Sequence, residues 1–451
     1  MVITIPDKVK TIIKILQDEG YEAYVVGGCV RDSVLGRIPN DWDITTNALP
    51  QDVKKLFRRT IDVGIEHGTV KVMMGEEGFE ITTYRIDGLY EDSRHPSSVE
   101  FTSNLREDLR RRDFTINAMA YNDKEGIVDL FGGLKDIEQK VIRAVGDPKE
   151  RFEEDALRIL RAVRFSAQLD YAIEENTKEA IKELSHTLSN ISAERIREEL
   201  EKLLMSDHPD RMRDAYYLGI TKAVLPEWDV MMECGQRSQH HYMSVGEHTL
   251  YALNDCVKED KQLCAKDRKI LRLTILLHDV AKPIKKRLGE DGWEHFTGHP
   301  EAGSEVAAGI LRRLKYDNAT IADVKVLVYY HDFRPELVLP EVRRLIINVG
   351  IERMPILMRV KWIDLAAHSN FQMDDKIAKL KGLEQLYKKI IEAGDCLNMK
   401  DLKVNGADLK SMGIESGPKM GEILRTLFDM VIEDPLANDK ELLLSKAREM
   451  I

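Results

Sequence analysis

The hydrophobic pattern of the chain changes at Gly146-Asp147-Pro148, and this change restricts the possible folds more than any other feature of the sequence. Before it, short apolar runs alternate with helical patterns, as in a mixed sheet packed with helices. After it, apolar residues recur almost throughout at the three- and four-residue spacing of amphipathic helices. The sequence therefore predicts an α+β fold, in which a mixed sheet plus helices is followed by an extended all-α region.

Periodicity and turn residues predict the elements of the N-terminal part. Apolar residues at helical spacing predict a helix over residues 7–18. A strand ending at Val26 runs into the turn Gly27-Gly28, and the turn Gly75 to Gly78 joins two further strands as a hairpin. The expected strands cover residues 24–26, 42–45, 69–74 and 79–85.

The length of the chain and the residues that interrupt its helical pattern predict four parts. Its 451 residues suffice for two to four domains with separate cores. Pro226 and loops rich in histidine and glycine interrupt the helical region, and most histidines lie in its middle. We expect a head (1–145), a helical neck (146–225), a helical body (226–374) and a helical tail (375–451).

Composition excludes several classes of protein. No apolar run approaches the roughly 18 residues that a membrane-spanning helix needs, and the first residues lack the pattern of a signal peptide. The five cysteines are odd in number and show no CxxC spacing, which favours reduced thiols and a cytoplasmic location. The formal net charge of −11 argues against broad binding to DNA, but a local basic strip can still bind RNA.

The strongest local signal lies in the head, where Gly27-Gly28 precedes Arg31, and Asp41 and Asp43 follow. Side chains two positions apart on a strand point to the same face, so the two carboxylates can lie side by side. Hard divalent cations prefer such oxygen ligands, and two of them can stabilise both the attacking and the leaving oxygen in phosphoryl transfer. The glycine pair lets backbone N–H groups approach triphosphate oxygens, and Arg31 adds positive charge. We expect two Mg²⁺ ions here.

Glu80 is a candidate for a third metal ligand. It alternates with Phe79, Ile81 and Thr83 along a predicted strand, so it faces away from them. On pattern alone, an ordinary residue on the polar face of a strand fits equally well. A DxD pair is also most often a surface turn, and only its combination with the glycine pair favours a metal site.

Five strings in the first 210 residues carry a resemblance to a known family. In chain order they read GGCVRDSVLGR, DWD, EITTYR, RRDFTINAMA and DLFGG. Together they resemble the bacterial class II CCA-adding tRNA nucleotidyltransferases. The resemblance implies a nucleotidyltransferase palm in the head, CTP and ATP as substrates, and nucleotidyl transfer to the 3′ end of tRNA.

The same resemblance implies roles for individual residues. Asp43 or Glu80 would help to activate the 3′-hydroxyl through a bound ion. A carboxylate can accept hydrogen bonds from both ribose hydroxyls, which favours ribonucleotides. A salt bridge at a strand end is the alternative, and it fits Arg111 better than the whole set. The residues that would hold ribose and phosphates are Arg111, Arg112, Asp113 and Asn117.

The neck carries Asp155 and Arg158 at i, i+3 spacing on a helix predicted over residues 150–169. Cytosine and adenine each present an amino donor beside a ring-nitrogen acceptor, whereas uracil and guanine present a carbonyl beside a ring N–H. A carboxylate only accepts and an arginine only donates, so this pair matches C and A. If the chain had no nucleotidyltransferase signals in its head, ordinary salt bridges within a helix would explain these charged residues better. By resemblance Glu154 orients Arg158, and the nucleotide-binding set is Glu154, Asp155, Arg158, Arg161 and Arg164.

The order of nucleotide addition depends on weaker signals. Residues 90–99 resemble the flexible loop of enzymes that add the terminal A, which disfavours a CC-only enzyme. An A-adding-only enzyme stays open, because the same motifs would serve it. Poly(A) polymerases share the head, but residues 64–73 resemble the CCA-adding version. A non-catalytic tRNA-binding protein would have lost Asp41 or Asp43, and both are present.

A second set of metal-ligand residue types lies in the body. Its order, H…HD…H…H…D, resembles HD phosphohydrolases, in which a metal-activated water attacks a phosphoester. Imidazole and carboxylate ligands suit Mn, Ni, Co or Fe, or Mg with water. The alternatives are a structural or degraded site and, as a different class of function, an HD phosphohydrolase whose head only binds RNA. The candidate ligands are His248, His278, Asp279, His299, His331 and Asp364.

Residues 403–434 of the tail resemble the C-terminal region of the class II family, which grips the tRNA elbow. Lysines there can contact phosphates, although for any single lysine a solvated helix face is the better interpretation. The candidates are Lys388, Lys389, Lys400, Lys403, Lys410 and Lys419. The expected partners are therefore the tRNA 3′ end and elbow, CTP and ATP, with no membrane and no DNA.

Overall fold

The computed structural model describes residues 2–87, 99–237 and 243–450. The chain divides into two compact units, residues 1–229 and residues 230–451. The finer borders expected between head and neck and between body and tail stay predictions. Except for Val99, the flexible loop predicted over residues 90–99 lies outside the described residues.

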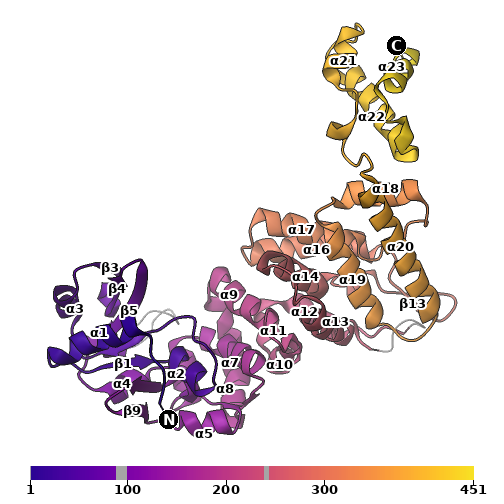
Figure 1. Cartoon of the computed structure of the whole chain (residues 1–451). Coiled ribbons are helices and arrows are strands. Elements are labelled where there is room, and N and C mark those ends of the chain that lie inside the picture. Colours follow the sequence, from indigo (N-terminus) through magenta and orange to yellow (C-terminus); the bar gives the residue numbers. More distant parts are fainter. Residues whose placement is uncertain (1, 88–98, 238–242, 451) are drawn as a thin grey trace. The chain divides into compact units, whose positions relative to one another are not determined.

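The first unit is built on a seven-stranded mixed sheet (Figure 1). The strands are ordered β3-β4-β5-β2-β1-β8-β9 across it. β2 and β5 run parallel, whereas the other neighbouring pairs are antiparallel. The strands are β1 (Ala23–Val26), β2 (Ile44–Thr46), β3 (Thr60–Gly64), β4 (Thr69–Met74), β5 (Glu77–Thr83), β8 (Met119–Asn122) and β9 (Gly126–Asp129).

The predicted strands are confirmed with shifted boundaries. β1 and the hairpin of β4 and β5 form where the alternation of apolar residues places them, although β5 begins earlier, at Glu77. The strand predicted over residues 42–45 begins only at Ile44. Asp43 still continues the pairing, because the N–H of Val26 donates to its carbonyl oxygen at 3.0 Å.

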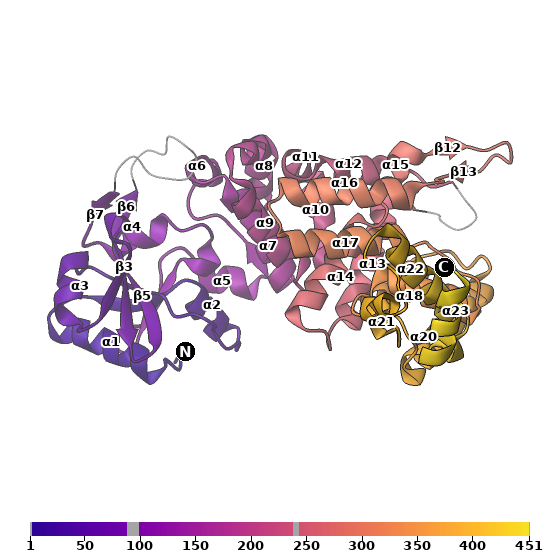
Figure 2. The ribbon, with the colours of Figure 1, turned by 90° about the horizontal axis from the view of Figure 1, so that it is seen from above.

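Two helices lie along the sheet, and a third follows β1 (Figure 2). α1 (Asp7–Asp18) confirms the predicted helix and contacts β1, and α3 (Pro50–Leu56) contacts β4. α2 (Gly28–Val34) begins directly after β1. The turn between them needs a glycine, because the φ of Gly27 is +84°.

The single helix predicted over residues 150–169 is wrong, because two helices replace it. α6 (Pro148–Glu154) ends at Asp155, whose backbone is extended with φ −142° and ψ 102°, and α7 (Leu157–Leu169) follows. Oδ1 of Asp155 accepts a hydrogen bond from the N–H of Leu157 at 3.1 Å. Aspartate competes with helix by bonding to nearby backbone N–H groups, and apolar spacing does not reveal this.

The rest of the first unit is helical, apart from short ladders that join β6 (Arg85–Asp87) to β7 (Val99–Phe101) and β10 (Val141–Ile142) to β11 (Ala172–Ile173). α7 is largely buried and contacts α9, whereas α6 contacts α8. The remaining helices are α4 (Leu105–Arg110), α5 (Gly133–Glu138), α8 (Glu175–Leu184), α9 (Ala193–Leu204), α10 (Met212–Tyr217), α11 (Ile220–Val224) and α12 (Pro226–Glu233), which reaches into the second unit.

The second unit confirms the predicted all-α region, except for a short hairpin of β12 (Arg287–Leu288) and β13 (Glu294–His295). α14 contacts α13, α17 and α19, and α16 packs along α17. The long α20 (Met373–Ala393) contacts α18 and α19. The other helices are α13 (Val245–Glu259), α14 (Ala265–Leu277), α15 (Lys282–Lys285), α16 (His299–Arg313), α17 (Asn318–Tyr330), α18 (Leu339–Val349) and α19 (Met354–Ala366).

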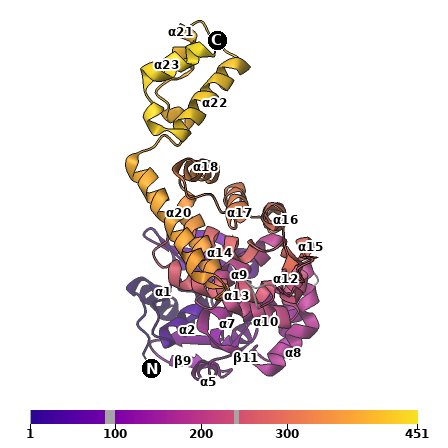
Figure 3. The same ribbon diagram turned by 90° about the vertical axis from the view of Figure 1, so that its right-hand side faces the viewer.

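The last three helices, α21 (Gly406–Ser411), α22 (Pro418–Glu433) and α23 (Lys440–Glu449), pack against one another (Figure 3). Leu409 and Leu443 are fully buried in the core that they enclose. The five cysteines are free thiols. None of the helices in the described part of the chain has the length and apolar character to span a membrane.

Candidate active site and metal centre

Asp43 and Glu80 lie beside each other on adjacent strands. The parallel pairing of β2 with β5 places Ile44 opposite Ile81, and one position back this register brings Asp43 next to Glu80. Ile44 and Ile81 are buried, so the residues that alternate with them face the other side, where both are exposed. The expectation that Glu80 points away from Phe79 and Ile81 is confirmed.

The carboxyl of Asp43 lies within electrostatic reach of two other carboxylates and of Arg112. Its pKa is raised above the ordinary value mainly by desolvation of the carboxyl; the charges of Glu80 and Asp41 add to the shift, and Arg112 opposes it. Only Lys71 offers Glu80 a cation in an ion pair among the described residues, with 3.5 Å between Nζ and Oε1. Three carboxylates therefore act on one another at the edge of β2.

The three carboxylates fit a hard divalent cation. Carboxylate oxygens are the ligands that Mg²⁺ prefers. Throughout the described ranges, the groups of three side chains whose ligand atoms lie within 4.8 Å of one another all belong to the second unit. The head carboxylates thus form an open arrangement, which a cation would draw together because it cancels their repulsion.

Gly27 lies beside an arginine of this site. A Cβ built on it would lie 3.0 Å from Nη1 of Arg112. Arg31, on α2, donates from Nη1 to Oδ1 of Asn117 at 2.6 Å and from Nε to Oδ1 of Asp32 at 2.9 Å. The glycine therefore keeps the backbone unobstructed next to guanidinium groups, as a triphosphate site requires.

A buried hydrogen-bond network centres on Asp113. Its Oδ1 accepts from the N–H of Phe114 at 2.8 Å and from Nδ2 of Asn117 at 3.0 Å, and its Oδ2 accepts twice from Arg161, at 2.9 and 2.6 Å. Burial alone would raise the pKa of Asp113, but Arg161 and Asn117 outweigh it and hold the pKa below its usual range. Both oxygens already have protein partners, so a ribose would have to share or replace them.

Asp108, which the sequence analysis missed, holds both Arg111 and Arg112. Arg111 donates from Nε and Nη2 to Oδ1 at 3.0 and 2.7 Å, and Nη2 of Arg112 lies 3.5 Å from Oδ2. Asp108 is 0% exposed and also accepts from Thr45 at 3.1 Å. The salt bridge considered for Arg111 therefore exists. The sequence did contain a signal for this contact, because Asp108 precedes Arg111 by three residues and Arg112 by four, the spacing of neighbours on a helix.

Asp155 and Arg158 of the neck each have a separate partner. Oδ2 of Asp155 accepts from Nη2 of Arg195 at 2.7 Å. Arg158 donates from Nη1 to Oε2 of Glu154 at 2.5 Å and from Nη2 to the carbonyl oxygen of Arg111 at 2.8 Å. The N–H of Arg158 still donates to the carbonyl oxygen of Asp155 at 3.0 Å, but the two side chains bind different partners. The expected contact of Glu154 with Arg158 is present. No local pattern pointed to Arg195, which is distant in sequence.

Phe165 gathers three arginines. The guanidinium of Arg164 lies 3.6 Å from its ring centroid, and those of Arg31 and Arg161 lie at 5.1 and 5.4 Å. Arg164 is buried and donates from Nε to Oε2 of Glu199 at 2.7 Å. Desolvation lowers the pKa of Arg164 to about 10, and Glu199 opposes this shift. The ring of Phe165 therefore lies close to all three guanidinium groups.

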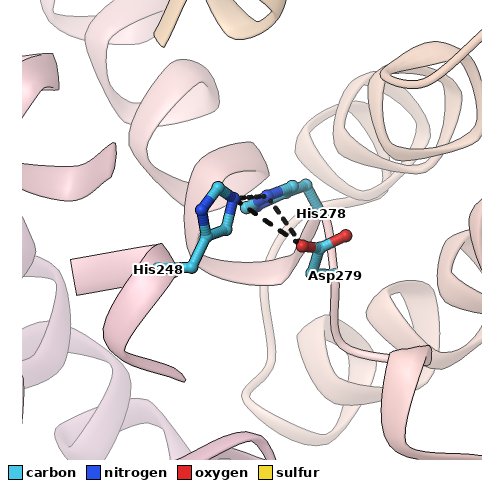
Figure 4. Close-up of side chains that lie close together, drawn as sticks. All are labelled: His248, His278 and Asp279. Atoms are coloured by element: carbon cyan, nitrogen blue, oxygen red, sulfur yellow. Dashed lines mark hydrogen bonds and ion pairs between the residues drawn. The ribbon is translucent and has the colours of Figure 1, made fainter. Parts of the chain in front are cut away.

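The six candidate ligands of the body meet in one cluster. They are His248 on α13, His278 and Asp279 after α14, His299 at the start of α16, His331 after α17 and Asp364 on α19. Figure 4 shows three of them facing one another. Nε2 of His278 lies 3.4 Å from Nε2 of His248 and 3.3 Å from Oδ2 of Asp279.

Asp279 connects the two halves of this cluster. Its Oδ2 faces Nε2 of His248 and His278, at 3.8 and 3.3 Å. Its Oδ1 faces Nε2 of His299 and His331, at 3.4 and 3.6 Å. The carboxylate therefore presents one oxygen to each pair of imidazoles.

Backbone carbonyl groups set the tautomers of the histidines. Nδ1 of His278, His299 and His331 lies 2.7, 2.9 and 2.7 Å from the carbonyl oxygen three residues earlier. Nδ1 of His248 lies 3.3 Å from the carbonyl oxygen of Ala367. With a single proton on Nδ1, an imidazole directs the lone pair of its Nε2 into the cluster, as in protein metal sites. Burial lowers the pKa of His278, but Asp279 and Asp364 outweigh it and raise the pKa to about 10, so a metal ion would displace the Nε2 proton of this histidine.

Two further residues of the cluster were missed from sequence. Nε2 of His368 lies 3.4 Å from Oδ1 of Asp364, which also lies 2.9 Å from Nε2 of His248. Nζ of Lys282 lies 2.7 Å from Oδ2 of Asp279. The available signals were helical: His368 follows Asp364 by four residues, and Lys282 follows Asp279 by three.

The chemistry of this donor set fits a metal ion. Neither oxygen of Asp279 has a hydrogen bond of normal geometry within the described part of the chain. Burial would raise its pKa, but His278 and Lys282 outweigh burial and hold the pKa well below its usual range, so the carboxylate is ionised. Imidazole with carboxylate suits Mn, Fe, Co or Ni. Which metal binds stays a prediction.

Three family models match parts of the chain. The poly A polymerase head domain matches residues 23–143, a probable RNA and SrmB-binding site of polymerase A matches residues 170–232, and a putative tRNA nucleotidyltransferase domain 2 matches residues 286–447. His248, His278 and Asp279 lie between the second and the third match.

A CCA-adding enzyme of Ligilactobacillus salivarius is 35% identical over 451 residues, which cover 99% of this chain and 98% of the relative. The chain belongs to the CCA-adding enzyme family. A CCA-adding enzyme of Lactiplantibacillus plantarum is 53% identical over 200 residues, 44% of this chain and 49% of that protein. The Bacillus stearothermophilus CCA-adding enzyme in complex with CTP is 28% identical, with a TM-score of 0.71 over 98% of this chain and 97% of that one. The predicted family and fold class are confirmed.

Replacing Asp43 with Asn tests the cation site of this CCA-adding enzyme without an activity assay. A carboxyl whose pKa is raised on folding costs stability at any pH where it is ionised, so the neutral variant should be at least as stable as wild type without metal at pH 7. A ligand at a hundredfold excess over its Kd stabilises by roughly 2.7 kcal/mol, which at about 2–4 °C per kcal/mol for a unit of this size is about 5–11 °C in Tm. We expect Asp43→Asn to lose this Mg²⁺-dependent gain in calorimetry of the full chain.

The matched control for this experiment is Glu66→Gln, which removes an exposed carboxylate. It should keep the whole Mg²⁺-dependent shift. Cations bound in the second unit are common to all variants and cancel in the comparison. An equal shift in Asp43→Asn and wild type would contradict the cation site.

Proposed function

We propose that this CCA-adding enzyme transfers CMP, CMP and then AMP, from CTP and ATP, to the 3′ end of tRNA. One observation carries the proposal: Asp43 and Glu80 share an exposed face beside Arg112, in a chain that matches a CCA-adding enzyme over its whole length. The similar enzyme from Bacillus stearothermophilus, solved with CTP, supports a nucleoside triphosphate as the ligand.

The reaction joins the tRNA 3′ oxygen to the α-phosphorus of the nucleotide. This O–P bond forms as the bond from the α-phosphorus to the pyrophosphate oxygen breaks, and the hydroxyl proton is released. Two Mg²⁺ ions, held by Asp41, Asp43 and Glu80, would lower the pKa of the 3′-hydroxyl and neutralise the pyrophosphate. Arg31 and Arg112 would bind the triphosphate oxygens, since guanidinium groups pair well with phosphate.

The ribose would contact Asn117 and Asp113. Because Arg161, Asn117 and the N–H of Phe114 occupy the Asp113 oxygens, the carboxylate acts first by fixing Asn117 and Arg161. The amide of Asn117, which also accepts from Arg31, can exchange its bond to Asp113 for one to a ribose hydroxyl. Arg111 stays on Asp108 and supports this segment.

The base would be read by Asp155 and Arg158. Each is held by a partner, Arg195 for the carboxylate and Glu154 for the guanidinium, so both are oriented before the base arrives. An acceptor beside a donor matches the edges of C and A. U or G would leave both groups unpaired, at a cost of about 1–3 kcal/mol for each buried group.

Two neighbouring activities share this site. An A-adding-only enzyme and a poly(A) polymerase need the same carboxylates and the same reader of the base. Matches to CCA-adding enzymes over the full chain favour complete CCA addition.

Labelled nucleotides separate these activities. The enzyme is incubated with each labelled NTP and with two tRNAs, one that ends at the discriminator base and one that ends in CC. We expect two C and then one A on the first tRNA, one A on the second, and no U or G. Addition of a single A to the tRNA that ends in CC, with no addition to the other tRNA, would show an A-adding enzyme. Long A tails would show a poly(A) polymerase.

A second activity, phosphoester hydrolysis, is favoured by the histidine cluster. Six predicted ligand residues from five helical segments converge with their Nε2 atoms and carboxylate oxygens on one place. A bound metal would lower the pKa of a water. In the hydrolysis, the water oxygen bonds to phosphorus, the bond from phosphorus to the ester oxygen breaks, and a water proton passes to the leaving oxygen. Cyclic phosphates or phosphomonoesters at damaged tRNA ends are suitable substrates.

A double variant, His278→Ala with Asp279→Ala, tests the hydrolase. We expect the metal-dependent hydrolysis of adenosine 2′,3′-cyclic phosphate by the Mn²⁺-loaded enzyme to fall to the level seen with excess chelator. Incorporation of CMP and AMP by the same preparation is the control for folding and should persist. Equal hydrolysis by the variant and wild type would refute this second activity.

The tail is the proposed contact for the tRNA elbow. All six candidate lysines are exposed, and Lys388 forms an ion pair with Glu384 at 2.9 Å. Exposed lysines on helices can reach backbone phosphates without ordering of further residues. We also infer a cytoplasmic location, where tRNA ends are completed and thiols stay reduced.

A further inference from the structure

A cavity of about 620 Å³ opens beside the histidine cluster. Its walls are residues 331–337, the second half of α19 and the first half of α20. His331, Asp364 and His368 line it, so it reaches the candidate metal centre. A second cavity, of about 420 Å³, is lined by the same three residues and extends to residues 294–300. The cluster therefore lies where two cavities meet.

Two cations come together in the larger cavity. Nζ of Lys376 is shielded from solvent and has no hydrogen-bond partner among the residues that the structure describes. Desolvation lowers the pKa of Lys376, and the positive charge of Arg334 adds to this shift, so the two cations are close. Asp332 occupies one side of Arg334, at 2.8 Å from Nη2. An anion bound between Arg334 and Lys376 would relieve their repulsion and give the ammonium its missing acceptor.

The wall that carries Arg334 is fixed in place. Lys361, on α19, donates from Nζ to the carbonyl oxygens of His331 and Phe333, at 2.8 and 2.7 Å. These bonds hold the segment that contributes a cluster histidine, an aromatic ring and the arginine. Because Lys361 is engaged with the backbone, the cations of the lining that remain for a ligand are Arg334, Lys376 and Lys379, and of these Lys376 has the shielded ammonium without a partner in the described part of the chain.

Apolar side chains line the same cavity. Phe333 and Leu337 are 43% and 42% exposed, although both are large hydrophobic residues, and Leu380 and Leu383 of α20 lie near them. An exposed aromatic ring beside cations fits a ligand that joins a flat apolar group to an anion. A nucleoside phosphate has both parts, since its base can stack on a ring and its phosphate can bind cations.

We propose that this cavity is the substrate pocket of the histidine cluster and binds a nucleoside phosphate, with Lys376 and Arg334 on phosphate oxygens and Phe333 against the base. The inference rests on the hydrolase activity proposed above and adds its substrate class and its binding residues. A volume of about 620 Å³ is in the range of small-molecule sites. The nucleoside phosphate is either a free nucleotide or the last nucleotide of an RNA.

Lys376→Met tests the pocket, because it keeps the aliphatic stem and removes the ammonium. Lys381→Met, on the same helix but outside the cavity, is the matched control. With Mn²⁺-loaded, full-length protein, we expect Lys376→Met to weaken the binding of adenosine 3′-monophosphate about tenfold in titration calorimetry, since a charge-assisted hydrogen bond is lost. The KM for adenosine 2′,3′-cyclic phosphate should rise by a similar factor, with a smaller change in kcat.

Three further measurements keep this test specific. The Mn²⁺ content per chain should be the same in all variants, which shows that the cluster is intact. The Tm of Lys376→Met should equal or exceed that of wild type, because an unpaired buried ammonium is removed. A parallel assay with tRNA that ends in a 2′,3′-cyclic phosphate identifies the source of the ligand. If Lys376→Met slows hydrolysis of this tRNA but not of the mononucleotide, the ligand is an RNA end. If it slows hydrolysis of the mononucleotide but not of this tRNA, the ligand is a free nucleotide.

The outcomes separate the pocket from the hydrolase activity. If Lys376→Met binds and turns over as wild type does, the pocket is refuted even where hydrolysis is found. If wild type binds the nucleotide without turnover and Lys376→Met binds it less well, the pocket is supported and the hydrolase activity fails. If wild type binds neither probe, the pocket is refuted. Binding to the head is shared by all variants and does not affect the comparison.

Discussion

The structure of the head depends on a strand pairing that holds acidic side chains together beside Arg112. The pairing of β2 with β5 places Asp43 and Glu80 side by side, and Asp41 lies close enough to act on the same carboxyl. A stable protein avoids such a crowd of negative charges unless a cation offsets it. The buried Ile44 and Ile81 fix the register, and so the apolar core keeps the acidic residues together.

The arginines around this site are organised by two buried acidic residues. Asp108 holds Arg111 and Arg112, and Asp113 holds Arg161. Each guanidinium is thus oriented before a nucleotide arrives, which lowers the entropy lost on binding. The second unit solves a related problem differently, because its cluster is buried and its imidazoles are oriented by backbone carbonyl groups. The carboxylates of the head thus lie on an exposed face, whereas the candidate ligands of the cluster are largely buried.

Local patterns in the sequence predicted most of the fold, and the resemblance of its motifs to a known family supplied most of the candidate site residues, whose roles stay predictions. Alternation placed Glu80 on the face opposite to Phe79 and Ile81, and the pairing of β2 with β5 then brings it next to Asp43. The resemblance of the histidine and aspartate order to HD phosphohydrolases pointed to residues that the structure brings together. Contacts that depend on tertiary structure were missed. Arg195 reaches Asp155 from a helix far along the chain, and the extended backbone at Asp155 splits a helix whose apolar spacing is continuous. The segment around Lys376 also gave no local sign of a cavity, because its walls come from residues distant in sequence.

The most direct test of the account is the loss of both aspartates that precede β2. Asp41 and Asp43 are replaced by Ala, and the incorporation of labelled CMP and AMP into tRNA without its CCA end is measured, with tRNA binding as the control for folding. Because the cations contribute several kcal/mol to the stability of the transition state, the rate should fall by about a thousandfold or more while tRNA still binds. Incorporation at the wild-type rate would contradict the central claim that these carboxylates hold the metal ions of nucleotidyl transfer.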